Sequence, residues 1–375
     1  MKKNRIRRRR WLFLAGALGV LFQVVGFSQG APGVDSQVVI SGLDNPWAVE
    51  SLDGGGFLIT EKPGRILYYR EGNQEAVLKV PQAINVGQGG LLDIEPSPGF
   101  PEDPRIFFTL SVGDASRGYG TALGLTSLNI RENDTSPLTF DPPILLWQMP
   151  DRFKTSRGQH FGSRIVIHQG YLYLTIGDRG EMNRAQLRQD PAGSVQRFML
   201  SELDGGAQDV RPELYTYGHR NPQGMAVHPQ RDEIWLHEHG PRGGDELNIL
   251  QAGDNYGWPL VTFGRNYNGT VISRNTHATG ITPPVLHWTP SIAPSGMAFY
   301  SADRYPQWQG SLFLGALAGQ HLRRVMLSAG EITGQEILLE NRLGRIRDVH
   351  AGRDGELYIL TDGNRAALYR LRPVE

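Results

Sequence analysis

Short apolar runs bounded by turn residues dominate the chain. Typical runs are Gly56–Thr60 and Tyr171–Thr175, and Gly, Pro, Asn and Asp fill the segments between them. Runs of about four to eight residues between such turn residues are typical of β-strands. No amphipathic pattern with helical spacing extends far enough to indicate a long helix. The pattern therefore predicts an all-β protein.

The apolar runs come in pairs that repeat along the chain. Each pair has a small or polar start, an apolar run, a turn with Pro, Gly or Asp, and a second apolar run. Six such units occur, at Pro46–Thr60, Gly90–Thr109, Ser163–Thr175, Gln223–Leu236, Ser295–Gly315 and Asp348–Thr361. One four-stranded propeller blade needs about 40–50 residues, so the longer intervals predict inserted loops. The repeat predicts a six-bladed β-propeller of four-stranded antiparallel blades.

The two ends of the mature chain are predicted to complete one blade together. Gln37–Ile40 pairs with C-terminal strands near Ala366–Leu371 in this interpretation, and closing the ring leaves few exposed strand edges. Two β-sandwiches in tandem are the alternative, but no linker separates two halves of the chain. The least regular segment, Ser116–Phe153, is predicted to be an extended loop.

The N-terminus has the pattern of a secretory signal peptide over residues 1–30. A basic head with Lys2 and Lys3 precedes an apolar stretch, Trp11–Phe27, and the small-x-small exit Ser28-Gln29-Gly30. A permanent anchor is the alternative, but 17 residues interrupted by glycines fall short of the ~20 apolar residues that a span prefers. We therefore expect a periplasmic or secreted protein without a stable membrane span after cleavage, with residues 31–375 as a single domain.

Composition narrows the possible partners. Lys and Arg total 38 and Asp and Glu total 38, so no global charge points to nucleic acid. The chain has no cysteine, which excludes disulfides, thiolate metal sites and a lipoprotein anchor. Oligomeric state is left open between a monomer and a homodimer.

Polar residues gather at the starts of the repeated units and after the second strand of two of them. Loops at one end of a propeller channel converge, so these residues are expected to meet. Amides, a histidine and three arginines facing one cavity suit a flat polyanionic ligand. The segments are Gln88, Gly158-Gln159-His160, Gly177–Gly180, Gly218–Asn221, Glu238–Pro241 and Arg345–Asp348.

With these segments in view, the chain resembles the soluble quinoprotein sugar dehydrogenases, and most closely the periplasmic aldose sugar dehydrogenases that use pyrroloquinoline quinone (PQQ). The resemblance covers nearly the whole mature chain and independently implies a six-bladed propeller. It is carried by Gly87–Asp93, Gly158–His160, Thr175–Asp178, Tyr217–Gly224, Gly240-Pro241, Asp245–Asn248, Tyr256–Pro259, Pro290–Phe299 and Arg345–Asp348.

The resemblance implies the catalytic roles. His160 corresponds to the general base that takes the proton from the anomeric hydroxyl while hydride leaves for the quinone, work that suits the pKa of histidine. Asp178 corresponds to the carboxylate that orients this histidine. Arg220 and Asn221 correspond to residues beside the reactive quinone carbonyl, where negative charge grows.

The cofactor contacts are likewise implied by the resemblance. Gln88 corresponds to an amide at the edge of the same pocket, and Arg345 and Arg347 to clamps on the carboxylates of PQQ. The backbone carbonyls of Gly240 and Pro241 correspond to ligands of a calcium ion that also binds the quinone and acts as a Lewis acid.

Two positions depart from the family pattern. Ala318 stands where the family usually has a lysine near the cofactor, and a neighbouring arginine such as Arg323 is one candidate to replace it. Gln159 stands where some relatives carry an acid, which leaves Asp178 as the expected partner of His160.

Structural roles remain open for several of these residues. Without the resemblance, His160 would be interpreted as a structural histidine held by hydrogen bonds. Arg220 would be interpreted as a residue that connects loops by donating to their carbonyl groups. Arg345 and Arg347 alternate on a strand, and pairing with acids is their alternative role. Asp245 is either a further ion ligand or a surface-loop residue, and Trp258 a sugar-cleft or core residue.

The sequence thus predicts an exported PQQ- and calcium-dependent dehydrogenase that oxidises aldose sugars at the anomeric carbon to lactones and passes electrons to an unidentified acceptor. The alternatives are a sorbosone-type aldehyde dehydrogenase, a non-catalytic propeller that binds a glycan or a protein, and, more weakly, a calcium-dependent lactonase.

Overall fold

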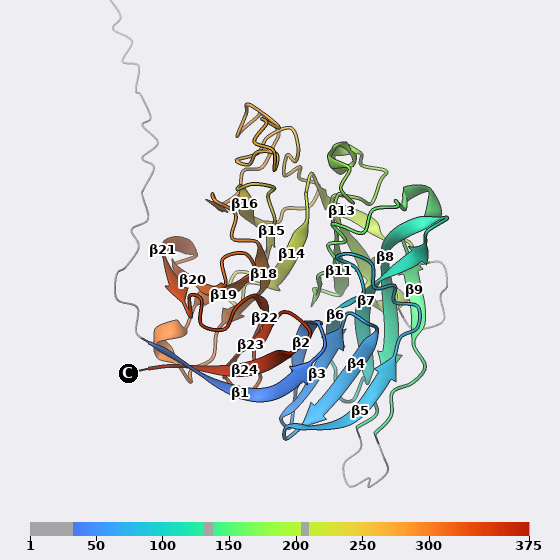
Figure 1. The fold of residues 1–375 in the computed structure, drawn as a ribbon, viewed down its shortest axis with the longest axis vertical. Coiled ribbons are helices and arrows are strands. Elements are labelled where there is room, and N and C mark those ends of the chain that lie inside the picture. Colours follow the sequence, from blue (N-terminus) through green and yellow to red (C-terminus); the bar gives the residue numbers. More distant parts are fainter. Residues whose placement is uncertain (1–32, 131–137, 204–209, 375) are drawn as a thin grey trace, which may run out of the picture.

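The strands form six four-stranded antiparallel sheets, arranged as the blades of a propeller (Figure 1). The computed structural model describes residues 33–130, 138–203 and 210–374. The predicted six-bladed propeller is confirmed. The predicted signal peptide, residues 1–30, lies outside the described residues, and no helix in the described part is long and apolar enough to cross a membrane.

Each blade runs outward from its innermost strand. Blade I has β2 (Pro46–Leu52), β3 (Gly56–Glu61), β4 (Arg65–Arg70) and β5 (Asn73–Lys79). Blade II has β6 (Leu91–Pro96), β7 (Arg105–Asp114), β8 (Gly118–Ser127) and β9 (Ile144–Gln148). Blade III has β10 (Ile165–His168), β11 (Tyr171–Ile176), β12 (Ser194–Met199) and β13 (Glu213–Tyr217).

The second half of the ring follows the same plan. Blade IV has β14 (Pro222–Val227), β15 (Ile234–Glu238), β16 (Asp245–Ile249) and β17 (Leu286–Trp288). Blade V has β18 (Pro294–Tyr300), β19 (Ser311–Ala316), β20 (His321–Ser328) and β21 (Glu331–Leu338). Blade VI has β22 (Ile346–Ala351), β23 (Leu357–Thr361), β24 (Ala366–Pro373) and β1 (Val34–Leu43). Four short 3-10 helices lie in the loops, at Asp151–Phe153, Met182–Gln186, Leu200–Glu202 and Pro306–Trp308.

The ring is closed by pairing of the first and last strands, as predicted. β1 lies antiparallel to β24 from Val34 opposite Pro373 to Leu43 opposite Ala366, and Figure 1 shows the two strands side by side. The blade that joins the chain ends therefore holds the propeller together without a disulfide.

One sequence expectation was wrong. Ser116–Phe153, predicted to be an extended loop, contains the two outer strands of blade II, β8 and β9. β8 is rich in glycine and threonine, so it lacks the continuous apolar run of the other strands. Gly124 shows the reason, because a Cβ there would lie 2.4 Å from the ring of Phe108 on β7.

The hydrophobic core lies between neighbouring blades. The second strands β3, β15, β19 and β23 are buried along their whole length, because a blade covers each of their faces. Between blades IV and V, Trp235 meets Phe299 edge to face, with ring centroids 5.6 Å apart. This packing explains the unbroken apolar runs in the sequence.

The start of the innermost strand is irregular in five of the six blades. A β-bulge at a strand end re-aims the neighbouring side chains. The register shifts fall between Pro46 and Ala48, Leu91 and Ile94, Pro222 and Gly224, Pro294 and Met297, and Ile346 and Asp348. Four predicted site residues come just before these bulges, namely Gln88, Arg220, Asn221 and Arg345, where the loops converge on the channel.

Candidate active site

The structure brings the predicted site residues together at one end of the channel. A cavity of about 400 Å³ joins Gln88, Asn221, Arg345 and Arg347. His160 joins this group through its N–H, which donates to Oε1 of Gln88. Burial lowers the pKa of His239 in the cavity wall to about 3, and the charges of Arg220 and Arg347 add to this. The remaining predicted residues, Asp178, Gly240 and Pro241, are linked to these by hydrogen bonds or by the chain.

His160 and Asp178 form a buried pair. Nδ1 of His160 lies 2.6 Å from Oδ1 of Asp178, and the two residues are 9% and 1% exposed. The predicted partnership with Asp178, rather than with the neighbouring Gln159, is present in the structure. Nε2 of His160 makes no hydrogen bond to any of the residues that the structure describes.

The backbone of His160 is held in an unusual conformation. Its φ is +54°, in the left-handed region that costs energy for a residue with a Cβ. The N–H of His160 donates to Oε1 of Gln88 at 2.7 Å. Gly177 crosses so closely that a Cβ there would lie 2.4 Å from the carbonyl oxygen of His160. The imidazole is therefore positioned by two neighbouring loops.

The electrostatic environment keeps His160 neutral and Asp178 ionised. Burial lowers the pKa of His160 below its ordinary 6.5, and the hydrogen bond to Asp178 opposes this while the Arg220 charge adds to it. Burial opposes ionisation of Asp178, yet the hydrogen bond from His160 and the nearby Arg220 charge hold its pKa below the ordinary value. An ionised Asp178 accepts the Nδ1–H, so Nε2 carries the lone pair and can accept a proton.

Trp258 fixes the other oxygen of Asp178. Its Nε1–H donates to Oδ2 at 2.8 Å, and the guanidinium of Arg220 lies 5.5 Å from the centre of its ring. The sequence suggested only a sugar cleft or core packing for Trp258. The contact was not predictable, because Trp258 and Asp178 are 80 positions apart and meet only when blades III and IV pack.

Arg220 lies just before β14 and is hydrogen-bonded to the loop that follows β15. Its Nη1 donates to the carbonyl oxygens of His239 at 3.0 Å and of Gly240 at 2.9 Å. Its backbone N–H donates to Oε2 of Glu238, and its carbonyl accepts from the N–H of Asp178 at 2.7 Å. Arg220 thus links two loops through Nη1 alone. The other nitrogens of its guanidinium group can still donate to a ligand.

Arg345 and Arg347 share one carboxylate. Nε of Arg345 lies 2.8 Å from Oδ2 of Asp362, and Nη2 of Arg347 lies 2.9 Å from Oδ1. The acid pairing considered from the sequence is therefore present, but it occurs in the cavity wall, since all three side chains line it. Two cations with one anion leave this wall positively charged.

Gly240 and Pro241 lie in a tightly wound loop. A Cβ on Gly240 would lie 2.2 Å from the carbonyl oxygen of Gly243, and its N–H donates to Oδ1 of Asp245 at 2.8 Å. Asp245 also accepts from Ser291, Ile292 and Ala293, so it is a buried structural carboxylate rather than a surface-loop residue. Among the described residues, no group of three or more His, Asp or Glu could hold a metal ion.

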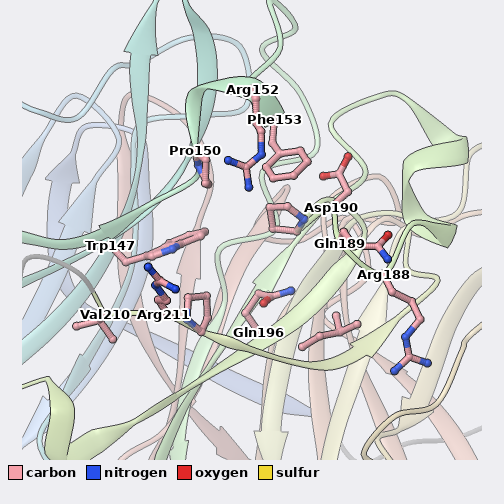
Figure 2. Close-up of a pocket in the computed structure, with 13 residues that line it drawn as sticks. Trp147, Pro150, Arg152, Phe153, Arg188, Gln189, Asp190, Gln196, Val210 and Arg211 are labelled. Carbon is pink, nitrogen blue, oxygen red and sulfur yellow. The ribbon is translucent and has the colours of Figure 1, made fainter.

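A second cavity, of about 570 Å³, lies between the outer strands of blades II and III (Figure 2). Trp147, Phe153 and Gln196 line it together with Arg152 and Arg188. None of the predicted site residues takes part, so the larger volume does not mark the predicted chemistry.

A family model described as "Glucose / Sorbosone dehydrogenase" matches residues 43–370. The chain belongs to the glucose/sorbosone dehydrogenase family. It is 40% identical over 353 residues to the aldose sugar dehydrogenase YliI of Escherichia coli K12, covering 91% of this chain and 93% of that one. The protein is therefore an enzyme, and its class of reaction is the oxidation of sugars.

Solved structures of the glucose/sorbosone dehydrogenase type share the fold. The soluble aldose sugar dehydrogenase of Escherichia coli in the apo form superposes with a TM-score of 0.82 at 36% identity, over 91% of this chain and 99% of that one. The PQQ-bound aldose sugar dehydrogenase of Streptomyces coelicolor gives a TM-score of 0.71 at 25% identity, over 91% and 100%.

The absence of the family lysine at Ala318 is not compensated by a neighbouring residue of the same blade. Ala318 is exposed and does not line the cavity, although its neighbour Leu317 does. Arg323, the candidate replacement for the absent lysine, lies elsewhere: its Nη2 contacts Nε2 of His321 at 3.2 Å. The lysine that does line the cavity is Lys62, which sequence reasoning missed because a lysine in a turn is ordinarily a surface residue.

Proposed function

We propose that the protein is an exported, PQQ- and calcium-dependent dehydrogenase that oxidises aldose sugars at the anomeric carbon to lactones. The observation that carries this proposal is the buried His160–Asp178 pair beside a cavity whose walls hold more cations than anions. A neutral base next to an anion-binding cavity suits removal of a proton from a sugar hydroxyl while an anionic cofactor is bound.

His160 is the proposed base. Its free Nε2 accepts the proton of the anomeric hydroxyl, and Asp178 stabilises the imidazolium that forms. Trp258 keeps Asp178 in place through Oδ2. When bound, PQQ supplies an acceptor for the hydride from the anomeric carbon. Arg220 stabilises the negative charge that grows beside it, a role that needs fixed donors and little water.

The residues present fit PQQ. Arg345 and Arg347 offer guanidinium groups to its carboxylates. Gln88 and Asn221 line the same cavity. The Gly162 N–H donates to Oδ1 of Asn221 at 3.3 Å, which leaves the NH₂ group of Asn221 as the donor for a ligand.

The residues also fit calcium, with one condition. Carbonyl oxygens such as those of Gly240 and Pro241 are suitable ligands, but Ca²⁺ takes about six to eight oxygens. The Gly240 oxygen already accepts from Arg220, whose charge repels a cation. The carbonyls of Gly240 and Pro241 would therefore supply only two of the ligands, and a calcium ion held there would act as a Lewis acid.

The remaining parts of the proposal rest on the sequence. Export to the periplasm or medium follows from the signal-like residues 1–30. The electron acceptor is a separate molecule that this chain does not identify. The family description covers glucose and sorbosone alike, so a sorbosone-type aldehyde is the second candidate substrate.

The test is reconstitution of the purified protein with PQQ and calcium, followed by a redox dye and either glucose or sorbosone. Dye reduction with glucose and release of a lactone support the proposal, and reduction with sorbosone alone favours the second candidate. His160→Ala is expected to bind PQQ normally but to lose about 10²–10⁴-fold in turnover. His277→Ala, at an exposed histidine, is the matched control, and unchanged turnover in His160→Ala would eliminate the proposed base.

A further inference from the structure

Lys62 reaches the predicted PQQ cavity from blade I, which lies between the blades that supply Gln88 and the arginines Arg345 and Arg347. It lies in the turn between β3 and β4, is half-buried, and lines the same cavity as Gln88, Asn221, Arg345 and Arg347. None of the chemistry proposed above uses it. A lysine in such a turn ordinarily extends into solvent, so a half-buried lysine in a cavity wall indicates a specific role.

The backbone of Lys62 is fixed by two neighbouring segments. Its N–H donates to the carbonyl of Asn45 at 3.0 Å, and its carbonyl accepts from the N–H of Leu91 at 3.1 Å. Gly90, with a φ of +139°, passes so close that a Cβ there would lie 2.5 Å from the Lys62 carbonyl oxygen. The stem of Lys62 therefore starts from a defined point beside the cavity.

The ammonium group of Lys62 is bound to the loop that also holds the backbone of the proposed catalytic base. Nζ donates to the carbonyl oxygen of Gly87 at 3.1 Å. The next residue, Gln88, accepts from the backbone N–H of His160. An ammonium group has three N–H donors, and Gly87 is its one acceptor among the residues that the structure describes. Two donors thus remain for a ligand.

The charges in the cavity wall do not balance without a ligand. Lys62, Arg345 and Arg347 face one carboxylate, Asp362, which both arginines already share. Burial lowers the pKa of Lys62, the Arg347 charge adds to this, and Asp362 opposes it. Like charges held together at a partly buried wall are unfavourable until an anion joins them. The imbalance therefore favours binding of a polyanion.

We propose that Lys62 is a PQQ-binding residue whose ammonium group binds a carboxylate of the cofactor from blade I, while Arg345 and Arg347 bind it from blade VI. This inference rests on the proposed function. It also means that Lys62 of blade I supplies the positive charge that the family lysine would have provided at position 318, in the loop after β19 of blade V.

The first test measures the dissociation constant of PQQ by tryptophan fluorescence quenching, with calcium present. Lys62→Met is expected to weaken PQQ binding about 10- to 100-fold, the range for loss of a hydrogen bond to a charged group, and Lys62→Arg to recover most of it. Lys79→Met is the matched control, because Lys79 is exposed on the outer strand of blade I. Equal affinity in Lys62→Met and the unaltered protein overturns the inference.

A second test needs no variant, so it stands even if Lys62→Met folds poorly. Lys62, Lys79 and Lys154 are the lysines of residues 33–375, which makes their acetylation easy to follow by mass spectrometry. PQQ with calcium is expected to slow acetylation of Lys62 at least several-fold and to leave Lys79 unaffected. Unprotected Lys62 in a protein that demonstrably binds PQQ contradicts the inference alone. An unaltered protein that binds no PQQ contradicts the proposed function and the inference together.

Discussion

At the scale of single residues, the chemistry depends on a contact between two loops of blade III. His160 comes before β10 and Asp178 after β11, and they meet because antiparallel neighbours bring these two chain ends to the same side. The resemblance to the quinoprotein sugar dehydrogenases implied this pair, and the glutamine at position 159, where some relatives carry an acid, left Asp178 as the expected partner. It did not predict Trp258, whose indole N–H holds the second oxygen of Asp178 and so limits how the carboxylate can turn.

Replacement of Asp178 by Asn tests the orienting role. The amide preserves the shape but removes the negative charge that holds the Nδ1–H of His160, so the wrong tautomer becomes available. We expect turnover to fall by roughly 10³–10⁴-fold, with little change in PQQ affinity, in a dye-coupled assay at saturating sugar. Asp141→Asn, at an exposed carboxylate, is the control. A loss of less than tenfold in Asp178→Asn would contradict the role.

The pH dependence of the reaction reports on His160 directly. Only the neutral imidazole accepts a proton, and burial lowers its pKa below 6.5. Activity should therefore be present above this lowered pKa and lost as the pH falls through it. We expect the acid limb of kcat/KM in the PQQ-loaded enzyme to have its midpoint below pH 6.5. A midpoint above 6.5, with PQQ still bound at that pH, would show that another group is the base.

At the scale of elements, the inner and second strands were predictable and the outer strands less so. The second strands are covered on both faces, so they appear in the sequence as unbroken apolar runs. β8 lies against the ring of Phe108 and uses glycine at position 124 to make room, which breaks the apolar pattern. Lys62 was missed for a related reason, because the turn after β3 meets the loop before β6 only in the folded ring.

Gly90→Ala tests how that turn is held. A methyl group at a φ of +139° would collide with the Lys62 carbonyl oxygen at 2.5 Å, so the turn must shift. We expect a loss of stability of roughly 1–3 kcal/mol and weaker PQQ binding. Gly42→Ala is the control, because Gly42 also has a positive φ but a Cβ added there would have nothing within 4 Å. It should cost about 1 kcal/mol without changing PQQ affinity, as thermal melting and fluorescence titration can show.

At the scale of the whole molecule, the active site depends on closure of the ring. Its residues come from blades I, II, III, IV and VI, so their mutual distances are set only when every blade is in place. Asp348 shows the coupling, because its carboxylate accepts from the Val49 N–H at 3.0 Å and pairs with Arg164 at 3.1 Å. Blades VI, I and III are thus tied through one buried acid, which a repeat pattern in the sequence could not reveal.

Removal of β1 is the corresponding whole-molecule prediction. Val34, Ile40 and Leu43 of this strand are 5%, 3% and 1% exposed, and burial of each contributes roughly 1.5–3 kcal/mol. Their sum is a large part of the stability of about 5–15 kcal/mol that is usual for a folded protein, and β24 would become an open edge. A chain that begins at Asp44 should therefore aggregate or melt roughly 6–13 °C lower, in proportion to that loss. A chain that begins at Gly33 is the control and should melt like the protein cleaved after residue 30. Equal melting of the two truncated chains would mean that pairing of β1 with β24 does not hold the ring closed.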